Sequence, residues 1–389
     1  RGRRQAATRP PMDHRSLAPR SPAHALARWG LCALAAALAL ALLAPAAEAG
    51  RKRAPLVGFN EQMLAAVDGL SPAQKLDLAH AAGATTIRLS LDWRPLEPYR
   101  DQWNEPAWQA AAEVYADARA KGMTPILTLI AAPWWARAGD CGGNWACVAP
   151  PAPEMDEEWA EFAAEAARRF PAAVFEVWNE PNMASFWWPE PDPPRYAELQ
   201  AIAYRAIKAE NAGAKVLAGG VAGALKTYPG VLMATRAFLR RAYRARPRSA
   251  RLMDGLSFHL YGFASGFARR GAFRTILRQA ARISRRLPER KPLWVTEVGV
   301  STGAPENVSE RRQRDLLWRA WRLLRKRRAV RAVVFHRLVE PRESVSDEWE
   351  WGMGWVRYAP ERAGGVPPVR PVFCRFANRL GRGYPGCRG

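Results

Sequence analysis

The sequence predicts an α/β fold in which eight parallel strands close into a (β/α)₈ barrel, a TIM barrel with a single catalytic domain. Apolar runs rich in β-branched and aromatic residues recur eight times, and amphipathic helical patterns lie between them. The first run continues through Gly58 and Asn60 to Glu61 without a Gly-rich phosphate loop. An open nucleotide-binding sheet is therefore not expected.

The predicted strands are distributed along the whole of residues 50–389. They begin near Pro55, Thr85, Thr124, Ala173, Lys215, Gly255, Pro292 and Val330. Apolar residues return at three- and four-residue spacing within residues 71–82, 108–121, 159–169, 195–211 and 311–327, which indicates helices. Strands that alternate with helices form a parallel sheet, and eight such units favour closure into one barrel domain over residues 50–389.

Residues 1–49 are typical of an export signal. An Arg-bearing segment ends near Arg28, an apolar run covers residues 31–44, and Ala47 and Ala49 provide a small-residue cleavage site before Gly50. The run is shorter than the ~20 residues of a membrane-spanning helix, so cleavage is favoured over an uncleaved anchor. A signal that starts at Met12 has ordinary length, which makes residues 1–11 an over-extended gene start. We expect a secreted protein, extracellular or associated with the cell wall.

Four cysteines follow the predicted signal, in a chain whose export would allow disulfides to persist. We expect the local pairs Cys141 with Cys147 and Cys374 with Cys387, each of which would fix a short loop. A metal site is the alternative, but the pairs lie far apart and lack CxxC spacing. There is no HExxH motif either, so we expect neither a metal nor a cofactor.

The chain is strongly basic, with 59 Lys and Arg against 36 Asp and Glu and a formal net charge of +23. The excess lies mainly in residues 240–251, 269–291 and 311–331. Solvated helix faces explain such stretches, and association with an anionic cell-wall polymer or membrane surface is the alternative. We expect no specific nucleic-acid site, and we expect a monomer.

Two of the predicted strands end in glutamates. The fourth, VFEVWNEP, delivers Asn179 and Glu180 at its end, and the seventh, LWVTEV, delivers Glu297. Strands four and seven lie on opposite sides of a barrel mouth, so their terminal carboxylates face each other. Two facing carboxyls are what glycoside hydrolysis requires, because one protonates the departing oxygen while the other attacks the anomeric carbon or activates water.

The segment FEVWNEPN at residues 175–182, combined with Thr296 and Glu297, resembles clan A of the glycoside hydrolases. It is most similar to family 39, followed by the family 5 cellulase-like enzymes. This resemblance implies hydrolysis of a β-linked oligo- or polysaccharide with retention, in which Glu297 is the nucleophile and Glu180 acts first as acid and then as base. The pKa of Glu180 must then exceed that of Glu297.

Four neighbours are expected to bind the substrate or to hold the catalytic pair. Arg88 interrupts the apolar second strand, and an unpaired inward charge is costly, so it is expected beside Glu297. The resemblance implies that Asn179 binds the sugar 2-hydroxyl and that Tyr261 contacts the nucleophile. His259 lies on the same strand face as Tyr261; a satisfied core histidine is its alternative.

Tryptophan-rich loops follow the third, fourth and eighth strands and predict an aromatic barrel mouth. Trp134, Trp187 and Trp351 are the candidates for stacking on sugar rings, and packing among the loops is the alternative for each. Many clan members carry a tryptophan at the end of the eighth strand, where this chain has His336. Either a tryptophan of the following loop, Trp349, Trp351 or Trp355, replaces it, or the subsite accepts a different sugar.

Two non-enzymatic functions compete with the hydrolase. A non-catalytic carbohydrate- or cell-wall-binding barrel would keep the tryptophans and lack one catalytic carboxylate, whereas both are present. A secreted basic protein that binds wall polymers or nucleic acid would bind in a salt-sensitive way without either glutamate.

Overall fold

The computed structural model describes residues 54–61, 70–143, 147–261, 272–287, 290–304, 306–341, 348–357 and 366–387. The predicted export signal, residues 1–49, lies outside the described residues. No helix in the described part of the chain is both long and apolar enough to cross a membrane.

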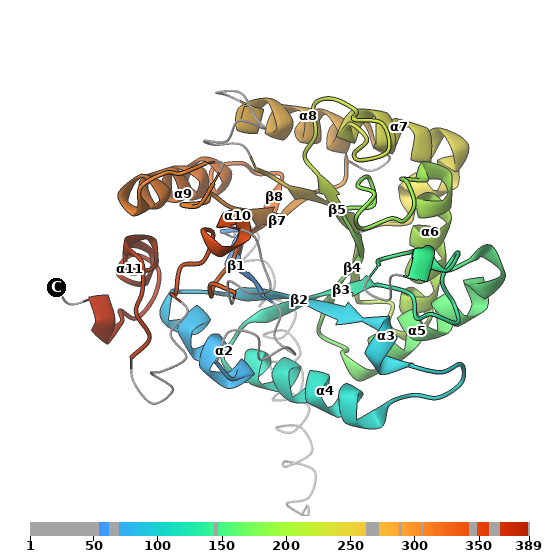
Figure 1. The fold of residues 1–389 in the computed structure, drawn as a ribbon, viewed down its shortest axis with the longest axis horizontal. Helices are drawn as coiled ribbons and strands as arrows, with labels where there is room; N and C mark the ends of the chain where they lie inside the picture. Colours follow the sequence, from blue (N-terminus) through green and yellow to red (C-terminus); the bar gives the residue numbers. More distant parts are fainter. Residues whose placement is uncertain are drawn as a thin grey trace, which may run out of the picture. The chain divides into compact units, whose positions relative to one another are not determined.

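Eight parallel strands form a closed barrel in chain order, as predicted (Figure 1). Each strand pairs with its neighbours in sequence, and β1 pairs with β8 to close the ring. The strands are β1 Leu56–Glu61, β2 Thr86–Asp92, β3 Thr124–Ile130, β4 Val174–Asn179, β5 Lys215–Ala222, β6 Gly255–His259, β7 Leu293–Val298 and β8 Val330–His336.

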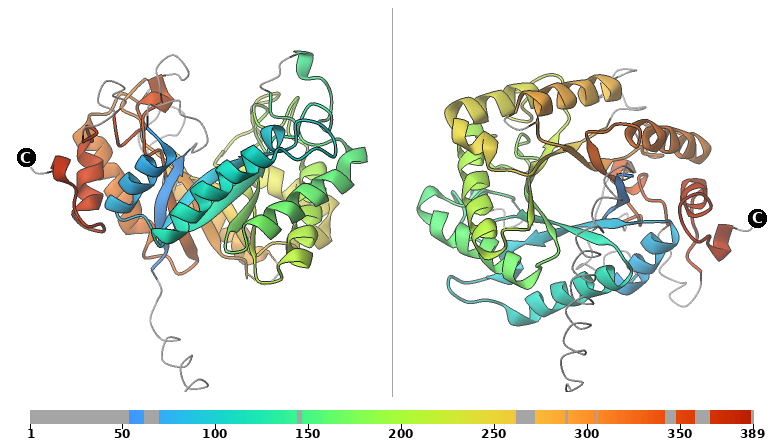
Figure 2. Two further views of the ribbon diagram at one scale, coloured as in Figure 1. Left: turned by 90° about the horizontal axis from the view of Figure 1, so that it is seen from below. Right: turned by 180° about the vertical axis from the view of Figure 1, so that it is seen from behind.

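Helices surround the strands (Figure 2). The longer ones are α2 Pro72–Ala81, α4 Glu105–Ala120, α5 Asp156–Arg169, α6 Pro193–Glu210, α7 Thr235–Ala245, α8 Ala272–Arg286, α9 Glu310–Leu324 and α11 Pro371–Ala377. Two short helices, α3 Trp93–Leu96 and α10 Glu348–Trp351, lie in the segments after β2 and β8. Single 3₁₀ turns occur at Cys141–Gly143, Pro153–Met155, Pro247–Arg251 and Pro385–Cys387.

Polar caps explain where the helices begin. Ser71 Oγ accepts from the Gln74 backbone N–H at 3.3 Å, and Gln74 Oε1 accepts from the Ser71 backbone N–H at 2.8 Å, which forms a capping box before α2. Asn104 caps α4 and Asp192 caps α6. These caps start both helices two or three residues earlier than their apolar periodicity predicts.

The barrel interior changes from apolar to polar along its axis. Ile126, Val174 and Leu217 pack inside the barrel with Trp294, Ala332 and Val334. Further along β4 the inward residue is Glu176, which is fully buried. The catalytic glutamates follow at the carboxyl ends of β4 and β7, so the polar layer supports the site from below.

Both expected disulfides are present. Cys141 pairs with Cys147 in the segment after β3, and Cys374 pairs with Cys387 across the end of α11. Each closes a short loop on the outside of the barrel.

Candidate active site

The end of β4 presents two consecutive polar side chains to the site. Alternation along a strand would send only one of them inward. Trp178 has φ of 75° and Glu180 has φ of 43°, both in the left-handed region, which costs of order 1–3 kcal/mol per non-glycine residue. Trp178 itself packs outward, against Trp187 at 5.4 Å between ring centroids. This break in the strand turns Asn179 toward Arg88 and Glu180 toward His259.

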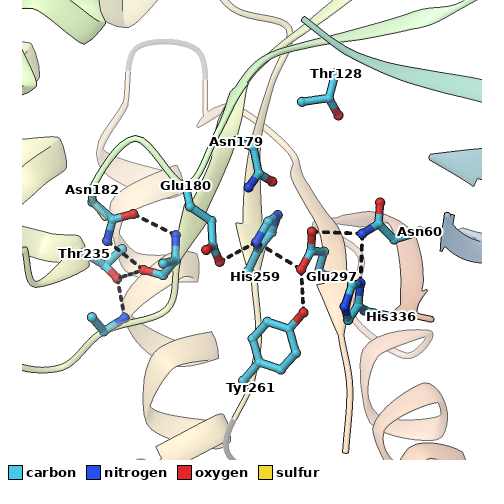
Figure 3. A network of polar contacts seen from close by, with 12 residues as sticks. Asn60, Thr128, Asn179, Glu180, Asn182, Thr235, His259, Tyr261, Glu297 and His336 are labelled. Carbon is cyan, nitrogen blue, oxygen red and sulfur yellow. Dashed lines mark hydrogen bonds and ion pairs between the residues drawn. The ribbon is translucent and has the colours of Figure 1, made fainter. Parts of the chain in front are cut away.

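Glu297 on β7 accepts hydrogen bonds from three different elements. Arg88 Nη1 donates to Oε1 at 2.8 Å and Asn60 Nδ2 donates to the same oxygen at 3.1 Å. The Tyr261 hydroxyl donates to Oε2 (Figure 3). Burial and the adjacent Glu297 charge raise the pKa of Tyr261 well above its usual value, so the phenol keeps its proton. A carboxylate held only by donors is suited to remain an anion.

Glu180 is held in a different environment. It is 8% exposed, and burial raises its pKa from 4.5 to about 7, against the opposing charge of Arg88. Its Oε1 lies 2.7 Å from Nδ1 of His259. Burial lowers the pKa of His259 to about 4, so this imidazole is neutral at neutral pH. A protonated carboxyl beside a neutral ring can act as a general acid.

The two glutamates approach closely. One carboxylate oxygen from each, together with a ring nitrogen of His259, lies within 4.8 Å of the others. His259 Nδ1 is also 3.4 Å from Glu297 Oε2, so the imidazole lies between the two carboxyls (Figure 3). The structure therefore brings together Glu180, Glu297, Arg88, Asn179, His259 and Tyr261, all six polar residues proposed from the sequence.

These three residues also satisfy the geometry of a metal site. However, the guanidinium of Arg88 is 2.8 Å from Glu297, and its charge would repel a divalent cation placed there. His259 and Tyr261 already bind the carboxylate oxygens that such an ion would use. The arrangement is better suited to proton transfer and nucleophilic attack than to holding a metal.

Glu176 is a functional neighbour that the sequence reasoning missed. Its Oε2 lies 2.7 Å from Arg88 Nε and 2.6 Å from Nη2, and it accepts from Thr128 Oγ1 at 2.8 Å. Burial alone would raise the pKa of Glu176, but the Arg88 charge outweighs it and the pKa is lowered. Glu176 therefore neutralises Arg88 from below. The criterion that identified Arg88, a charge inside an apolar strand, applies equally to Glu176.

Asn60 and Glu350 were also missed. Asn60, at the end of β1, accepts from Arg88 Nη1 at 2.8 Å, and its Nδ2 lies 2.9 Å from His336 Nδ1. The other ring nitrogen of His336 lies 2.8 Å from Glu350 Oε2. A polar residue at a strand end was the available signal for Asn60. Nothing local in the sequence distinguishes Glu350 from the other acids of its loop.

The aromatic expectations hold only in part. Trp134 is 66% exposed, as a stacking platform requires. The expectation for Trp187 is wrong, because this residue is 2% exposed and packs against Trp178 and Tyr196. Trp351 is half-buried, with the Arg370 guanidinium 5.7 Å from its ring centroid.

Of the candidates to replace a strand-eight tryptophan, Trp355 is fully buried and packs on Phe59, so it is excluded. Trp349 is half-buried, and its ring centroid is 5.4 Å from that of Tyr261. Since Tyr261 binds Glu297, Trp349 is the loop tryptophan tied to the catalytic cluster.

No protein-family model matches the sequence, and no curated protein matches it. Solved structures do match. The chain is similar to a family 39 glycoside hydrolase from the gut symbiont Bacteroides cellulosilyticus WH2, with 20% identity, a TM-score of 0.60 and coverage of 84% of this chain and 63% of that one. It is also similar to a GH5_18 structure from Streptomyces cattleya in complex with GlcNAc, with 18% identity, a TM-score of 0.62 and coverage of 84% and 80%.

A third similar structure is the exo-β-1,4-mannosidase Op5Man5 from Opitutaceae bacterium strain TAV5, at 16% identity and a TM-score of 0.60. It is covered over 60% of its length, so the chain spans less than two thirds of this protein and of the family 39 structure. The resemblance noted in the sequence is thus confirmed at the level of architecture: the chain has the (β/α)₈ barrel fold of these glycoside hydrolase structures.

Proposed function

We propose that this protein is a retaining glycoside hydrolase that cleaves a β-linked oligo- or polysaccharide by double displacement. The observation that carries the proposal is the pairing of a buried carboxyl, Glu180 with a pKa of about 7, and a carboxylate, Glu297, whose oxygens accept from Arg88, Asn60 and Tyr261. Two carboxyls with such different environments are suited to the roles of acid and nucleophile.

In the first step Glu297 attacks the anomeric carbon while Glu180 gives its proton to the glycosidic oxygen. The bond from the anomeric carbon to that oxygen breaks, and a glycosyl ester with Glu297 forms. In the second step Glu180, now a carboxylate, takes a proton from water as the water attacks the same carbon and releases Glu297. Two inversions give net retention.

The spacing supports retention over inversion. Retaining enzymes hold their carboxyls ~5–5.5 Å apart, whereas inverting enzymes leave ~6.5–9.5 Å for a water molecule. Carboxylate oxygens of Glu180 and Glu297 lie within 4.8 Å. Asn179, fixed by the 2.8 Å hydrogen bond from Arg88, lies next to Glu180 in the chain, where the clan resemblance assigns it to the sugar 2-hydroxyl.

The structural neighbours support the same class of reaction, since they carry the names of a family 39 glycoside hydrolase and an exo-β-1,4-mannosidase. The non-catalytic alternative would need one carboxylate to be absent or misplaced, and both face one site. We also propose that the chain is exported and that cleavage precedes Gly50, which N-terminal sequencing of the secreted protein would test.

The decisive experiment combines a substrate panel with two variants. The purified chain is screened against β-linked aryl glycosides and polysaccharides; Glu297→Ala should then abolish turnover. Glu180→Ala should keep the first step on substrates with good leaving groups, and added azide should yield a glycosyl azide of the substrate's anomeric configuration. Glu190→Gln, an exposed acid in the segment after β4, is the matched control and should be fully active. An inverted azide product would refute double displacement.

A further inference from the structure

A groove of about 680 Å³ lies on the outside of the barrel, at α9 and α11. We call it the α9/α11 groove. These two helices are packed side by side, with Trp318 of α9 edge-on to Phe376 of α11 at 5.0 Å (Figure 1). Its lining includes three arginines, Arg314, Arg375 and Arg379, together with Asn378. The groove is thus formed by the helical layer, whereas the catalytic glutamates come from the strand ends.

The charge of the groove is one-sided. None of the described residues that line it is acidic. The nearest carboxylate is Asp315, which accepts from Arg314 Nε at 2.8 Å. The hydrogen bond from Arg314, and after it the charges of Arg375 and Arg312, lower the pKa of Asp315. One exposed carboxylate thus faces several guanidinium groups, and donors of Arg375 and Arg379 are left to bind another anion.

The surroundings extend this charge over neighbouring helices. Neither α7 nor α8 contains an acidic residue, and α9 contains only Glu310 and Asp315. Exposed basic side chains on and around α9 are Arg311, Arg312, Arg319, Arg322, Arg325, Lys326, Arg327, Arg328 and Arg331. Clustered basic charge of this kind raises the local concentration of anionic ligands.

The groove is also held in shape. The disulfide between Cys374 and Cys387 joins α11 to the chain end, and both of its residues line the groove. Phe376 anchors α11 to β8 through Phe335 at 5.0 Å. Because the walls are fixed, little ordering entropy is lost when a ligand binds.

We propose that the α9/α11 groove binds a carboxylate- or phosphate-bearing segment of an anionic polysaccharide, apart from the catalytic site. Guanidinium groups bind both anions through paired hydrogen bonds. Among polyanions, the choice of a polysaccharide rests on the proposed glycosidase function. No large apolar side chain is exposed on α7, α8, α9 or α11 in the part of the chain that the structure describes. Insertion into a bilayer and stacking of nucleic-acid bases therefore lack their usual side chains.

The test compares two triple variants with the same loss of charge. Arg314→Gln/Arg375→Gln/Arg379→Gln removes the groove arginines, and Arg278→Gln/Arg282→Gln/Arg285→Gln removes three exposed arginines of α8. Binding of polygalacturonate is measured by calorimetry, with neutral dextran as the blank. The groove variant should lose roughly tenfold or more in affinity, and the α8 variant much less. Equal losses in both would overturn the groove as a site.

Further arms keep the outcome clear. Arg314→Lys/Arg375→Lys/Arg379→Lys keeps the charge but loses the paired geometry, so it should bind with intermediate affinity; it replaces the Gln variant if that one melts early. Tighter binding of anionic vesicles or of an oligonucleotide than of polygalacturonate would refute the polysaccharide assignment. Binding is measured on Glu180→Ala/Glu297→Ala as well, so that failure of the proposed hydrolysis leaves the groove test intact.

Discussion

Nδ1 of His259 lies 2.7 Å from Oε1 of Glu180, and this contact fixes where the imidazole carries its proton. Nε2 of the same ring is buried and has no hydrogen-bond partner, and it faces Gly220, where an added Cβ would lie 2.2 Å from it. A proton on Nε2 would leave a buried donor unsatisfied. The neutral ring therefore carries its proton on Nδ1 and donates to Glu180.

Replacing His259 with Phe should raise the pKa of Glu180 further, because the carboxylate loses a donor while it stays buried. The basic limb of kcat/KM should move upward by roughly one pH unit. His259→Asn is the matched control, since its amide nitrogen can donate from about the Nδ1 position, and its limb should stay near that of the wild type. A downward shift in the Phe variant would mean that Glu180 donates to the ring instead.

The wild-type enzyme should lose activity above about pH 7. The pKa of Glu180 is about 7, and only its protonated form can act as the acid, so kcat/KM should fall about tenfold per pH unit in the basic limb. A basic limb that begins near pH 5 would show that Glu180 is not the acid that limits the rate.

Glu180→Gln should be more stable than the wild type at alkaline pH. The pKa of Glu180 is raised above its unfolded value of 4.5, so its contribution is present below 4.5 and is lost as pH rises through 7. The neutral amide avoids this loss, which amounts to at most about 3 kcal/mol. Urea unfolding at pH 5 and pH 8 measures it, and a variant that gains nothing between the two pH values would contradict the shift.

Glu176→Gln should destabilise the protein and lower kcat. It removes the carboxylate that neutralises buried Arg88, a change that typically costs about 3–5 kcal/mol for a buried pair. Thr128→Val removes one hydrogen bond to the same carboxylate without changing its charge, and should cost about 1 kcal/mol. If both variants unfold at the same urea concentration, Glu176 is not the compensating charge. Single-turnover rates separate the loss of kcat from the loss of folded protein.

The barrel could be predicted because its signals are local. Each strand is an apolar run, each helix has its own periodicity, and the terminal glutamates follow from where the strands stop. Arg88 was found because a charge is conspicuous in an apolar strand. Glu350 could not be found in this way, because its partner His336 is on a different element and only the folded loop brings them to 2.8 Å.

The tryptophans show the limit most clearly. Trp134 and Trp187 both lie in Trp-rich segments after a strand, yet one is 66% exposed and the other 2%. Whether a loop tryptophan faces solvent depends on which neighbours pack on it. For Trp187 these neighbours are Trp178 and Tyr196, from two different elements, so no local pattern reports its burial.

Alanine at these two positions should therefore give opposite results. Trp187→Ala should cost about 3–5 kcal/mol of unfolding free energy, as expected for a large buried aromatic side chain. Trp134→Ala should change stability by about 0.5 kcal/mol or less, and should raise KM on long substrates if its ring stacks on sugar. Urea unfolding and kinetics on short and long substrates measure both effects. A stable Trp187→Ala variant with a raised KM would restore Trp187 as a binding residue.

The pair of His336 and Glu350 holds two opposing demands. Burial alone would raise the pKa of Glu350, but the attraction of His336 dominates and lowers it to about 2. Burial alone would lower the pKa of His336, but the charges of Glu350 and Glu297 raise it. The contact with Asn60 Nδ2 at 2.9 Å favours the neutral ring instead, because only an unprotonated Nδ1 can accept.

Glu350→Gln removes the attraction and leaves the Asn60 contact, so the pKa of His336 should fall. Because the pKa of Glu350 is depressed, its stabilisation is present above 4.5 and is lost as pH falls toward 2. We expect the variant to lose about 1–2 kcal/mol at pH 6, allowing for the partial exposure of Glu350, and to converge with the wild type at strongly acidic pH. Urea unfolding and NMR titration of His336 measure both effects. An unchanged His336 pKa would show that Asn60, and not Glu350, governs the ring beside the nucleophile.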